Sequence, residues 1–369
     1  MKLQIQRETL LKPLQLVIGV VERKQTQPIL ANVLLRTKDN KLSVTGTDTE
    51  VELIGQISLA QPSTEDHALT IPGRKLMDIC RALPENAPVE LYREQEKIVL
   101  CSGRSRFTLS TLPVEDFPHV EPQDTHLSFT MAKQLLRGLL QRTAFAMAQQ
   151  DVRYYLNGLL LEVHPEKLHA VATDGHRLAF NSALVHTNTD RRLQIILPRK
   201  GVLELMRLLE DNNESITVTI SNHYLRIMTD HFAFTSKLVE GRFPNYERVI
   251  PKNGDKWITL DRDVLKAALQ RTAILCNDKF KGVRFELRSN SLRILANNPE
   301  QEAAEEEISI NYSQEDLDIG FNVHYLLDIL AIAKPGDIKL TFIDANSSVL
   351  VEELPTSSES VFVIMPMRL

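Results

Sequence analysis

The residues best suited to acid–base chemistry stand together in the segment Thr173-Asp174-Gly175-His176-Arg177. A carboxylate two residues from an imidazole can transfer protons when a substrate reaches both groups. Similar polar segments, however, occur about one third of the chain earlier, at Thr47-Asp48-Thr49-Glu50, and one third later, at Asn297-Asn298-Pro299-Glu300. We therefore interpret the segment as a turn of a repeated fold rather than as a catalytic centre.

Two other groups of side chains have the donor atoms of a metal site. His164 and His169 lie five residues apart around Pro165, a spacing that does not suit a pair of metal ligands on a helix, and we interpret them as solvated loop residues. The second group is a run of carboxylates without the glycine-containing EF-hand pattern. Its members are Glu300, Glu302, Glu305, Glu306 and Glu307. We expect no metal and no cofactor, and we interpret the acidic run as a solvated or partner-facing surface.

The sequence has none of the motifs that mark common catalytic and nucleotide-binding sites. It lacks GxGxxG, GxxxxGKS or GxxxxGKT, HExxH and GxSxG. The three cysteines, Cys80, Cys101 and Cys276, form no CxxC pair and are odd in number, which argues against a disulfide framework or a thiolate zinc site. We expect reduced, mostly buried thiols and a protein that is not an enzyme.

The elements around these segments repeat three times along the 369 residues, with a spacing near 123. Apolar residues at i, i+1 and i+4 mark one face of a helix, so a helix is expected to open each third. Its apolar members are Leu10, Leu11 and Leu14, then Leu135, Leu136 and Leu139, then Val264, Leu265 and Ala268. The tetrapeptide Gln141-Arg142-Thr143-Ala144 returns unchanged as Gln270-Arg271-Thr272-Ala273. A second helix is expected at Leu76, Ile79 and Cys80, at Val202, Leu205 and Met206, and at Leu326, Ile329 and Leu330.

An alternating strand lies between the two helices of each third and ends in the polar turn. It covers 42–47, 168–173 and 292–297, and alternation before turn residues is typical of a half-buried strand. The fold class is therefore α+β, with three repeated domains in which antiparallel sheets cover one side of a helix pair. We expect the domains at 1–125, 126–254 and 255–369, with boundaries in the polar, proline-bearing stretches 121–125 and 251–256.

Charge is distributed unevenly between the predicted helices and the rest of the chain. The whole chain has 43 Lys and Arg against 48 Asp and Glu, a net charge of −5. The predicted helical segments nevertheless carry twenty Lys and Arg and only ten Asp and Glu; they are 7–24, 74–83, 131–153, 199–210, 261–282 and 323–334. Basic helices placed equivalently in three similar domains can line one surface that suits a phosphate backbone. Because no base-reading module is present, we expect nonspecific, salt-sensitive binding to nucleic acid.

Opposite charges mark the first and last thirds of the chain. Arg104 and Arg106 alternate along an edge-like strand that also carries Phe107 and Leu109, whereas the acidic run lies in the last third. This arrangement favours head-to-tail association between chains, which either closes into a ring or continues as a filament.

The carboxyl terminus is unusually apolar. Residues 361–364 have the composition of a strand, and Met365-Pro366-Met367-Arg368-Leu369 follows where chain ends are normally polar. Two interpretations remain open: packing into a local core, or a partner pocket with adaptable thioethers.

Neither a membrane span nor a signal peptide is expected. The longest apolar run covers only 14–21, far short of the roughly 20 residues of a span, and Lys2 and Arg7 stand where a signal peptide would be apolar. We expect a cytoplasmic protein.

The whole chain resembles the bacterial DNA polymerase III beta subunits, the sliding clamps. The segments that carry the resemblance are 150–158, 172–178, 241–244, 296–302 and 365–369. The resemblance implies a homodimeric ring of six like domains, with helices inside and sheets outside, of which one chain forms half. Such a ring encircles duplex DNA and tethers the replicative polymerase without catalysing a reaction. The implied partners are DNA, the polymerase III catalytic subunit, the clamp loader, and other polymerases and repair proteins that carry clamp-binding peptides.

The resemblance also implies three sets of site residues. The DNA-facing set is Lys24, Arg74, Gln150, Tyr154, Tyr155 and Lys200. The peptide pocket is Leu156, Thr173, Gly175, His176, Arg177, Leu178, Pro244, Arg248, Val249, Phe280, Asn322, Tyr325, Asn346, Ser348, Val363, Met365, Pro366, Met367 and Arg368. The dimer interface is Lys75, Arg104, Arg106, Phe107 and Leu109 of one chain against Ile274, Leu275, Glu300, Glu302, Glu305 and Glu306 of the other.

Three positions depart from the family pattern. Lys24 stands where arginine is familiar, which keeps the charge but loses the planar fork. Asn346 stands where an apolar residue is familiar, and Ala303 where a carboxylate is common. A peptide-docking scaffold with merely solvated basic helices is the alternative function, and an enzyme using Asp174 and His176 is a distant third.

Overall fold

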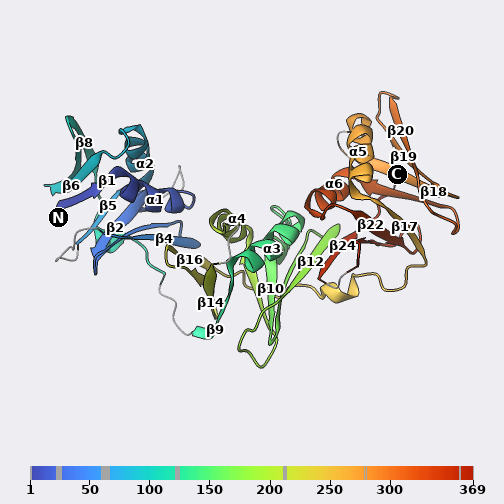
Figure 1. Ribbon diagram of the computed structural model, residues 1–369, viewed down its shortest axis with the longest axis horizontal. Helices are drawn as coiled ribbons and strands as arrows, with labels where there is room; N and C mark the ends of the chain where they lie inside the picture. Colours follow the sequence, from blue (N-terminus) through green and yellow to red (C-terminus); the bar gives the residue numbers. More distant parts are fainter. Residues whose placement is uncertain are drawn as a thin grey trace. The chain divides into compact units, whose positions relative to one another are not determined.

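One order of elements occurs three times in succession in the computed structural model. The structure describes residues 2–21, 27–59, 67–120, 125–210, 214–277, 279, 281–356 and 359–368. Within these residues each third has a strand, a helix, four strands, a second helix and three strands. The threefold repeat predicted from the spacing is therefore confirmed. Figure 1 shows the elements in chain order.

The first third runs from β1 to β8. Its elements are β1 (Lys2–Gln6), α1 (Arg7–Val17), β2 (Asn32–Lys38), β3 (Lys41–Thr47), β4 (Val51–Ser58), β5 (His67–Pro72), α2 (Gly73–Ala82), β6 (Pro88–Glu94), β7 (Lys97–Ser102) and β8 (Ser105–Ser110). Short 3-10 helices cover η1 (Pro28–Ala31) and η2 (Val114–Asp116).

The middle third runs from β9 to β16. Its elements are β9 (Thr125–Ala132), α3 (Lys133–Thr143), β10 (Gly158–His164), β11 (Lys167–Thr173), β12 (Arg177–Leu184), β13 (Leu193–Pro198), α4 (Arg199–Leu208), β14 (Ser215–Ser221), β15 (Tyr224–Met228) and β16 (Phe232–Lys237). Three 3-10 helices lie at η3 (Ala144–Ala146), η4 (Tyr154–Leu156) and η5 (Tyr246–Arg248).

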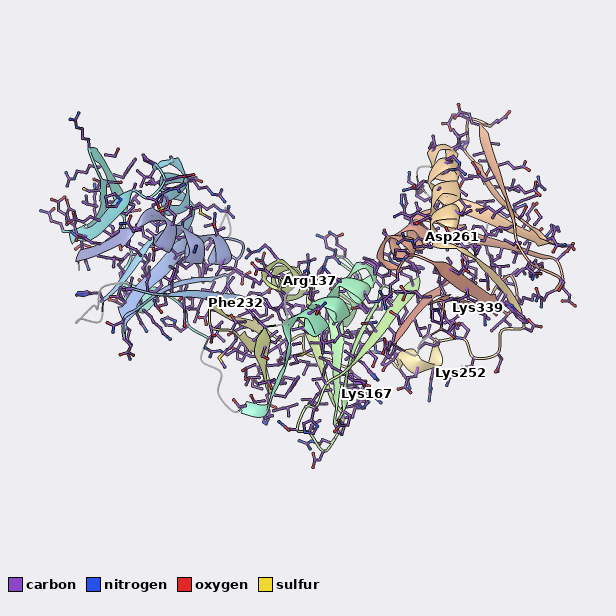
Figure 2. All side chains as sticks on the ribbon, in the orientation of Figure 1. Arg137, Lys167, Phe232, Lys252, Asp261 and Lys339 are labelled. Carbon is purple, nitrogen blue, oxygen red and sulfur yellow. The ribbon has the colours of Figure 1, made fainter. Side chains whose placement is uncertain are left out.

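The last third runs from β17 to β24. Its elements are β17 (Lys256–Asp261), α5 (Arg262–Thr272), η6 (Ala273–Leu275), β18 (Gly282–Arg288), β19 (Ser291–Asn297), β20 (Ala303–Ser309), β21 (Leu317–Asn322), α6 (Val323–Ile332), β22 (Asp337–Phe342), β23 (Val349–Glu353) and β24 (Ser360–Ile364). Asp261, which is labelled in Figure 2, caps α5, because its Oδ1 accepts the amides of Asp263 and Val264 at 2.9 Å each.

The strands form two eight-stranded and two four-stranded antiparallel sheets, divided between two compact units. Unit 1 holds the described residues within 1–134, 186–188 and 200–238, and unit 2 holds those within 135–185, 189–199 and 239–369. Unit 1 has the sheets β5-β2-β3-β4-β16-β15-β14-β9 and β1-β6-β7-β8. Unit 2 has β13-β10-β11-β12-β24-β23-β22-β17 and β20-β19-β18-β21. The middle third thus contributes four strands to each unit.

Each eight-stranded sheet combines four strands of one third with four strands of the next, and we call the strand pair where they meet a joint. In unit 1, β4 pairs with β16, and Gly55 lies opposite Phe232. In unit 2, β12 pairs with β24, and Asn181 lies opposite Ser360. The two joints use equivalent strands, since β12 follows the β10–β11 hairpin as β4 follows the β2–β3 hairpin. Backbone hydrogen bonds therefore continue the sheet from one third into the next.

The helices bury the predicted apolar faces, but the predicted register of the first helix is wrong by one residue. Leu10 is buried in α1, and its equivalents at the fourth position of α3 and α5 are the buried residues Leu136 and Leu265. Leu135 and Val264, which the sequence pattern aligned with Leu10, are 40% and 50% exposed. The offset from α1 to α3 is 126 residues, the same as the offset from α2 to α4.

The first helix of each third is also shorter than predicted. The segment 131–153 was expected to be helical, but α3 ends at Thr143, whose hydroxyl donates to the Leu139 carbonyl at 2.7 Å. Thr272 makes the same type of bond to Ala268 at the end of α5. A threonine that bonds back to the preceding turn competes with continuation of the helix.

None of the described helices combines the length and apolarity that crossing a membrane requires.

The close approach of α1 to β4 predicts a steric effect at Gly55. A Cβ on Gly55 would lie 2.9 Å from Cβ and 3.0 Å from the carbonyl oxygen of Pro13. We expect Gly55→Ala to reduce the free energy of unfolding by about 1–3 kcal/mol, as for other overpacked sites. Gly138→Ala in α3 is the matched control, because no atom lies within 4 Å of the added Cβ. Urea unfolding should show Gly138→Ala unchanged or slightly stabilised; equal destabilisation of both variants would contradict the assignment.

Candidate functional site

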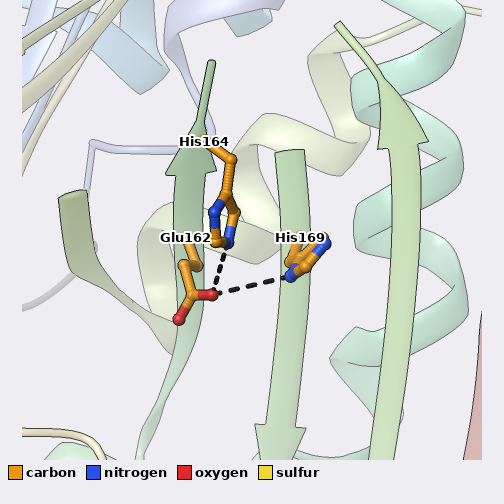
Figure 3. Close-up of side chains that lie close together, drawn as sticks. All are labelled: Glu162, His164 and His169. Carbon is orange, nitrogen blue, oxygen red and sulfur yellow. Dashed lines mark hydrogen bonds and ion pairs between the residues drawn. The ribbon is translucent and has the colours of Figure 1, made fainter. Parts of the chain in front are cut away.

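The structure corrects the interpretation of His164 and His169 as solvated loop residues. Glu162 and His164 are two residues apart on β10, and Glu162 lies directly opposite His169 on β11. The antiparallel pair therefore brings all three side chains together (Figure 3). His164 Nε2 lies 2.6 Å and His169 Nδ1 3.6 Å from Glu162 Oε1. His169 and Glu162 are both buried.

The Glu162 carboxylate is held by several polar neighbours. Gln194 Nε2 donates to Oε2 at 2.6 Å, and Arg192 forms a short ion pair with the same oxygen. Burial alone raises the pKa of Glu162, but hydrogen bonds from His169, Gln194, Arg192 and His164 outweigh it and hold the pKa well below the usual range. The side chain is thus an anion inside unit 2.

The segment that suggested acid–base chemistry is a tight turn between β11 and β12. Asp174 Oδ1 accepts the amides of His176 and Arg177 at 2.9 and 3.0 Å, and Thr173 donates to the Arg177 carbonyl. Asp48 accepts the amides of Glu50 and Val51 in the same way in the first third. The interpretation as a repeated strand-end turn is confirmed by this shared hydrogen-bond pattern.

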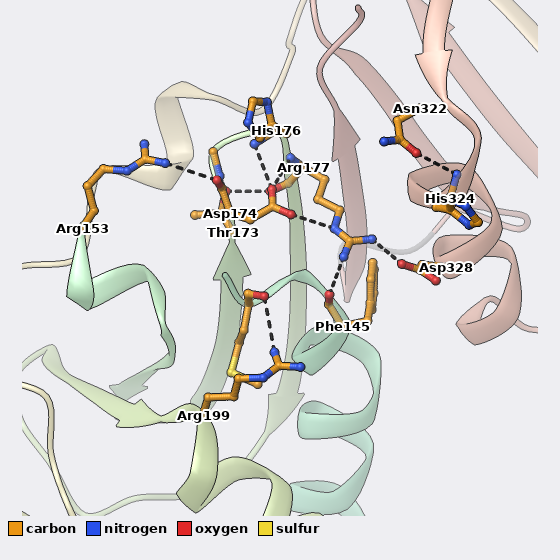
Figure 4. Close-up of polar contacts among 12 residues, drawn as sticks. Phe145, Arg153, Thr173, Asp174, His176, Arg177, Arg199, Asn322, His324 and Asp328 are labelled. Atoms are coloured by element: carbon orange, nitrogen blue, oxygen red, sulfur yellow. Dashed lines mark hydrogen bonds and ion pairs between the residues drawn. The ribbon is translucent and has the colours of Figure 1, made fainter. Parts of the chain in front are cut away.

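Arg177 ties this turn to the last third. Its guanidinium donates to Asp174 Oδ2 at 3.0 Å, to Asp328 Oδ2 on α6 at 2.5 Å and to the Phe145 carbonyl at 2.8 Å (Figure 4). Its Cζ lies 4.7 Å from the Tyr325 ring centroid and 5.3 Å from that of Phe145. A guanidinium with so many partners is a structural clamp, and it fixes the turn against α6.

The carboxyl-terminal segment follows the same turn instead of fraying. After β24 the amide of Met365 donates to the His176 carbonyl at 2.8 Å, and the amide of Met367 donates to Gly320 at 2.9 Å. Met365 remains 41% exposed. The backbone is therefore anchored while an apolar, flexible side chain faces solvent.

The predicted pocket residues fall into a buried floor and an exposed rim, all within unit 2. Leu156, Leu178 and Val363 are at most 2% exposed and share a cluster with Phe243 and Tyr246. A surface depression beside them gathers the predicted residues Arg248, Val249, Asn346, Ser348 and Met365. A second depression gathers Asn346, Pro366, Met367 and Arg368. Asn346 lines both, so the position that departs from the family pattern lies where they meet.

Some predicted pocket residues lie elsewhere or have another evident role. Asn322 caps α6, since its Oδ1 accepts the His324 amide at 2.9 Å. Pro244 is exposed next to the buried Phe243. Gly175 has a φ of +88°, which suits glycine in the turn, and Tyr325 stacks on His176 with ring centroids 6.4 Å apart. Phe280 lies outside the described residues.

Sequence reasoning missed several residues of the first depression. They are Asn245, Glu247, Ile250, Pro251, Lys252, Ile343 and Ser347. Most follow directly after the Phe243-Pro244 pair, so the loop behind that pair was the available signal. Phe145 and Asp328 were also missed, because only the folded chain brings them to Arg177.

The predicted DNA-facing residues of unit 1 are engaged in contacts within the unit. Lys200 on α4 forms a short ion pair with Asp48, and Arg74 on α2 donates to the Val21 carbonyl at 2.7 Å. Lys24 lies outside the described residues.

In unit 2, the predicted DNA-facing residues lie in and just before η4. Tyr154 is 57% exposed and meets Tyr155 edge to face, with ring centroids 5.8 Å apart. Gln150 is exposed with a φ of +58°. Nearby, a side-chain hydrogen bond from Arg153 lowers the pKa of Asp151 to about 2, so the loop carries a fixed ion pair.

The predicted interface residues lie at two sheet edges and next to them. Arg106, Phe107 and Leu109 are on β8, and Arg104 is in the turn before it, whereas Glu305 and Glu306 are on β20. Lys75 is exposed on α2, Ile274 and Leu275 form part of η6, and Glu300 and Glu302 lie in the turn before β20. Some of the charged residues already have partners within the chain: Arg106 pairs with Glu94, and Glu306 accepts two hydrogen bonds from Arg271.

Three family models together match almost the whole chain. They describe the N-terminal, central and C-terminal domains of the DNA polymerase III beta subunit, and they match residues 1–121, 130–245 and 247–368. Among curated proteins, the "Beta sliding clamp" of Pseudomonas putida is 53% identical and that of Escherichia coli 47% identical, each over 369 residues and 100% of both chains.

Solved structures give the same result. A DNA polymerase sliding clamp from Pseudomonas aeruginosa with a ligand is 52% identical and superimposes with a TM-score of 0.97 over 100% of both chains. A sliding clamp from the same organism bound to griselimycin is 52% identical, with a TM-score of 0.96 and the same coverage. With its threefold repeat, its joined sheets and these full-length matches, the chain belongs to the DNA polymerase III beta subunit family, the sliding clamps.

Proposed function

We propose that the chain is a DNA polymerase processivity factor that acts as a homodimeric ring around duplex DNA and performs no catalysis. The observation that carries the proposal is a difference between equivalent strands. β4 and β12 are each paired with a strand of the next third, whereas their equivalent β20 is a sheet edge. β16 and β24 are likewise paired, whereas their equivalent β8 is an edge. A second copy that pairs its β8 with β20, and its β20 with β8, completes the pattern and closes the ring.

The register of the missing joint follows from the two existing ones. Ser105 begins β8 and Phe232 begins β16, each after a two-residue turn, so these two residues are equivalent. Gly55 in β4 and Glu306 in β20 are also equivalent, because each lies three residues beyond the first residue of its strand that pairs with the preceding strand. Because Phe232 lies opposite Gly55, Ser105 is expected opposite Glu306 of the other copy. In an antiparallel pair this places Arg106 opposite Glu305.

The helices provide the surface for DNA. The six helices carry fourteen Lys and Arg and five Asp and Glu, although the whole chain is acidic. Phosphate contacts carry no sequence information, and each contact adds to the barrier for sliding. Encirclement retains the ring topologically, so strong contacts are unnecessary. On this basis we propose that the predicted DNA-facing residues contact DNA and that the protein is located in the cytoplasm, at the nucleoid.

The two depressions of unit 2 are proposed to bind short apolar peptides of the polymerase, the clamp loader and other replication and repair proteins. Support comes from the exposed apolar side chains of Val249 and Met365, which are 43% and 41% exposed. They stand beside a buried floor, and Arg248 and Arg368 supply positive charge at the rim. Grooves in which apolar side chains anchor the ligand are one recurring mode of peptide recognition.

Ring closure predicts a dependence on DNA topology. After loading, the clamp should be retained on nicked circular duplex but lost from the same duplex once it is linearised, because a ring slides off an open end. Gel filtration of loaded complexes at moderate salt measures the difference. Equal retention on both forms would contradict encirclement, and a linear DNA blocked at both ends serves as the control that should restore retention.

The proposed strand pairing predicts a charge-dependent dimer. Replacing Arg104 and Arg106 with Glu should shift the chain to monomers in sedimentation velocity, because carboxylates would then face the acidic β20. Adding Glu305→Arg should recover part of the dimer. Lys38→Glu with Arg93→Glu, which changes the same charge away from both edges, should leave the dimer intact. A persistent dimer in the Arg104 and Arg106 variant would show that these edges are not the interface.

The carboxyl-terminal residues should be needed for partner binding. Deleting 365–369 removes Met365 and Met367 from the depressions, and we expect loss of measurable polymerase binding by surface plasmon resonance. Sedimentation should still show a dimer, because β8 and β20 are untouched. Unchanged affinity for the polymerase would rule out this pocket as the binding site.

A further inference from the structure

We propose that Glu162, His164 and His169 form a binding site for a divalent ion of the zinc class. One potential ligand atom from each of these three residues lies within 4.8 Å of the other two. All three residues belong to the β10–β11 hairpin of unit 2, and β-strand pairing positions them: Glu162 and His164 share one face of β10, and His169 lies opposite Glu162. Figure 3 shows both imidazoles directed toward the same carboxylate oxygen.

The separations of the donor atoms suit a small ion. With zinc bonds of about 2.0–2.1 Å, tetrahedral ligand atoms are roughly 3.3 Å apart. Glu162 Oε1 is 2.6 Å from His164 Nε2 and 3.6 Å from His169 Nδ1, values on either side of that separation. The Tyr246 hydroxyl is a fourth polar atom at the site, 3.3 Å from Glu162 Oε1 and 3.5 Å from His169 Nδ1. Because 2.6 Å is a direct hydrogen-bond distance, the His164 ring must move away from Glu162 Oε1 for the ion to enter.

The second oxygen of Glu162 is already committed to other partners. Arg192 and Gln194 both bind Oε2, which orients the carboxylate and leaves Oε1 toward the histidines. Such outer contacts are a common feature of metal sites. The Arg192 cation also repels a metal ion, so the site should bind more weakly than a structural site with four thiolate or imidazole ligands.

The donor set selects the class of ion. Two imidazole nitrogens and one carboxylate oxygen suit zinc and its neighbours, whereas magnesium and calcium prefer oxygen donors alone. The side chain of His164 is 22% exposed, so the ion has a route from solvent at the end of β10. The competing explanation is a proton shared between His164 and Glu162, which satisfies the same atoms without a metal.

Metal titration of the full-length chain distinguishes the two explanations. After treatment with a chelator, the protein is titrated with Zn2+ against a chromophoric competitor. We expect one ion per chain, and a roughly tenfold weaker affinity in His164→Gln and in His169→Gln. His223→Gln, which changes an exposed histidine in the β14–β15 turn, is the matched control and should bind as the unchanged chain does.

A second measurement guards against misfolding of the variants. Glutamine keeps a donor for Glu162, and far-UV circular dichroism with melting in chelator checks the fold of each variant. Independently, Co2+ added to the unchanged chain should give the intense visible absorption of a tetrahedral site, and Zn2+ should remove it. Any one of three results would overturn the proposal in favour of the shared proton: no stoichiometric Zn2+ uptake by the unchanged chain, no such Co2+ spectrum, or as much Zn2+ uptake by the folded His164→Gln and His169→Gln variants as by the unchanged chain.

Discussion

Backbone hydrogen bonding at the edges of β-sheets is the constraint on which the rest of the molecule depends. An edge strand presents unpaired N–H and C=O groups that a second strand can satisfy. The chain satisfies two such pairs of edges internally, at β4–β16 and β12–β24, and the repeat leaves β20 and β8 as the equivalent pair. Charge adds direction to this geometry. β8 carries Arg106 and β20 carries Glu305 and Glu306, so two copies of the same edge repel each other whereas unlike edges attract.

A sliding clamp must attract DNA and still allow it to move. Ion pairs within each unit affect how strongly the basic side chains of the helices can bind phosphate. Lys200 is held by Asp48, and Arg142 on α3 is held by Glu353 at 2.5 Å with both side chains mostly buried. A cation that already has an anionic partner gains less from a phosphate than a free cation does. In the proposed ring, the helices would therefore attract DNA through a field whose individual contacts are weakened, which is suited to sliding.

The sequence predicted what depends on short spacing and missed what depends on strand register. The repeat, the helix pairs and the polar turn at Asp174 follow from local patterns, and the structure has them. The helix expected to run to residue 153 ends at Thr143, whose hydroxyl donates to the Leu139 carbonyl, and hydrophobic periodicity does not record such local polar contacts. His164 and His169 were judged by helical spacing, whereas an antiparallel pair of strands sets their actual geometry. Their neighbours Arg192 and Tyr246 come from distant segments, which no local pattern links to them.

The three copies of the polar turn illustrate how one repeated module acquires different roles. In the first copy, Asp48 accepts the Val51 amide and also binds Lys200. In the second, Asp174 accepts the equivalent amide and fixes Arg177. In the third, Asn298 accepts the Glu302 amide across a turn one residue longer. The backbone requirement is the same in all three copies, an oxygen that accepts an amide at the start of the next strand. What differs is the second partner of each side chain, Lys200 of α4 in the first copy and Arg177 of β12 in the second. In the third copy an uncharged amide replaces the carboxylate, so this position adds no further negative charge to that of Glu300, Glu302 and the acidic β20.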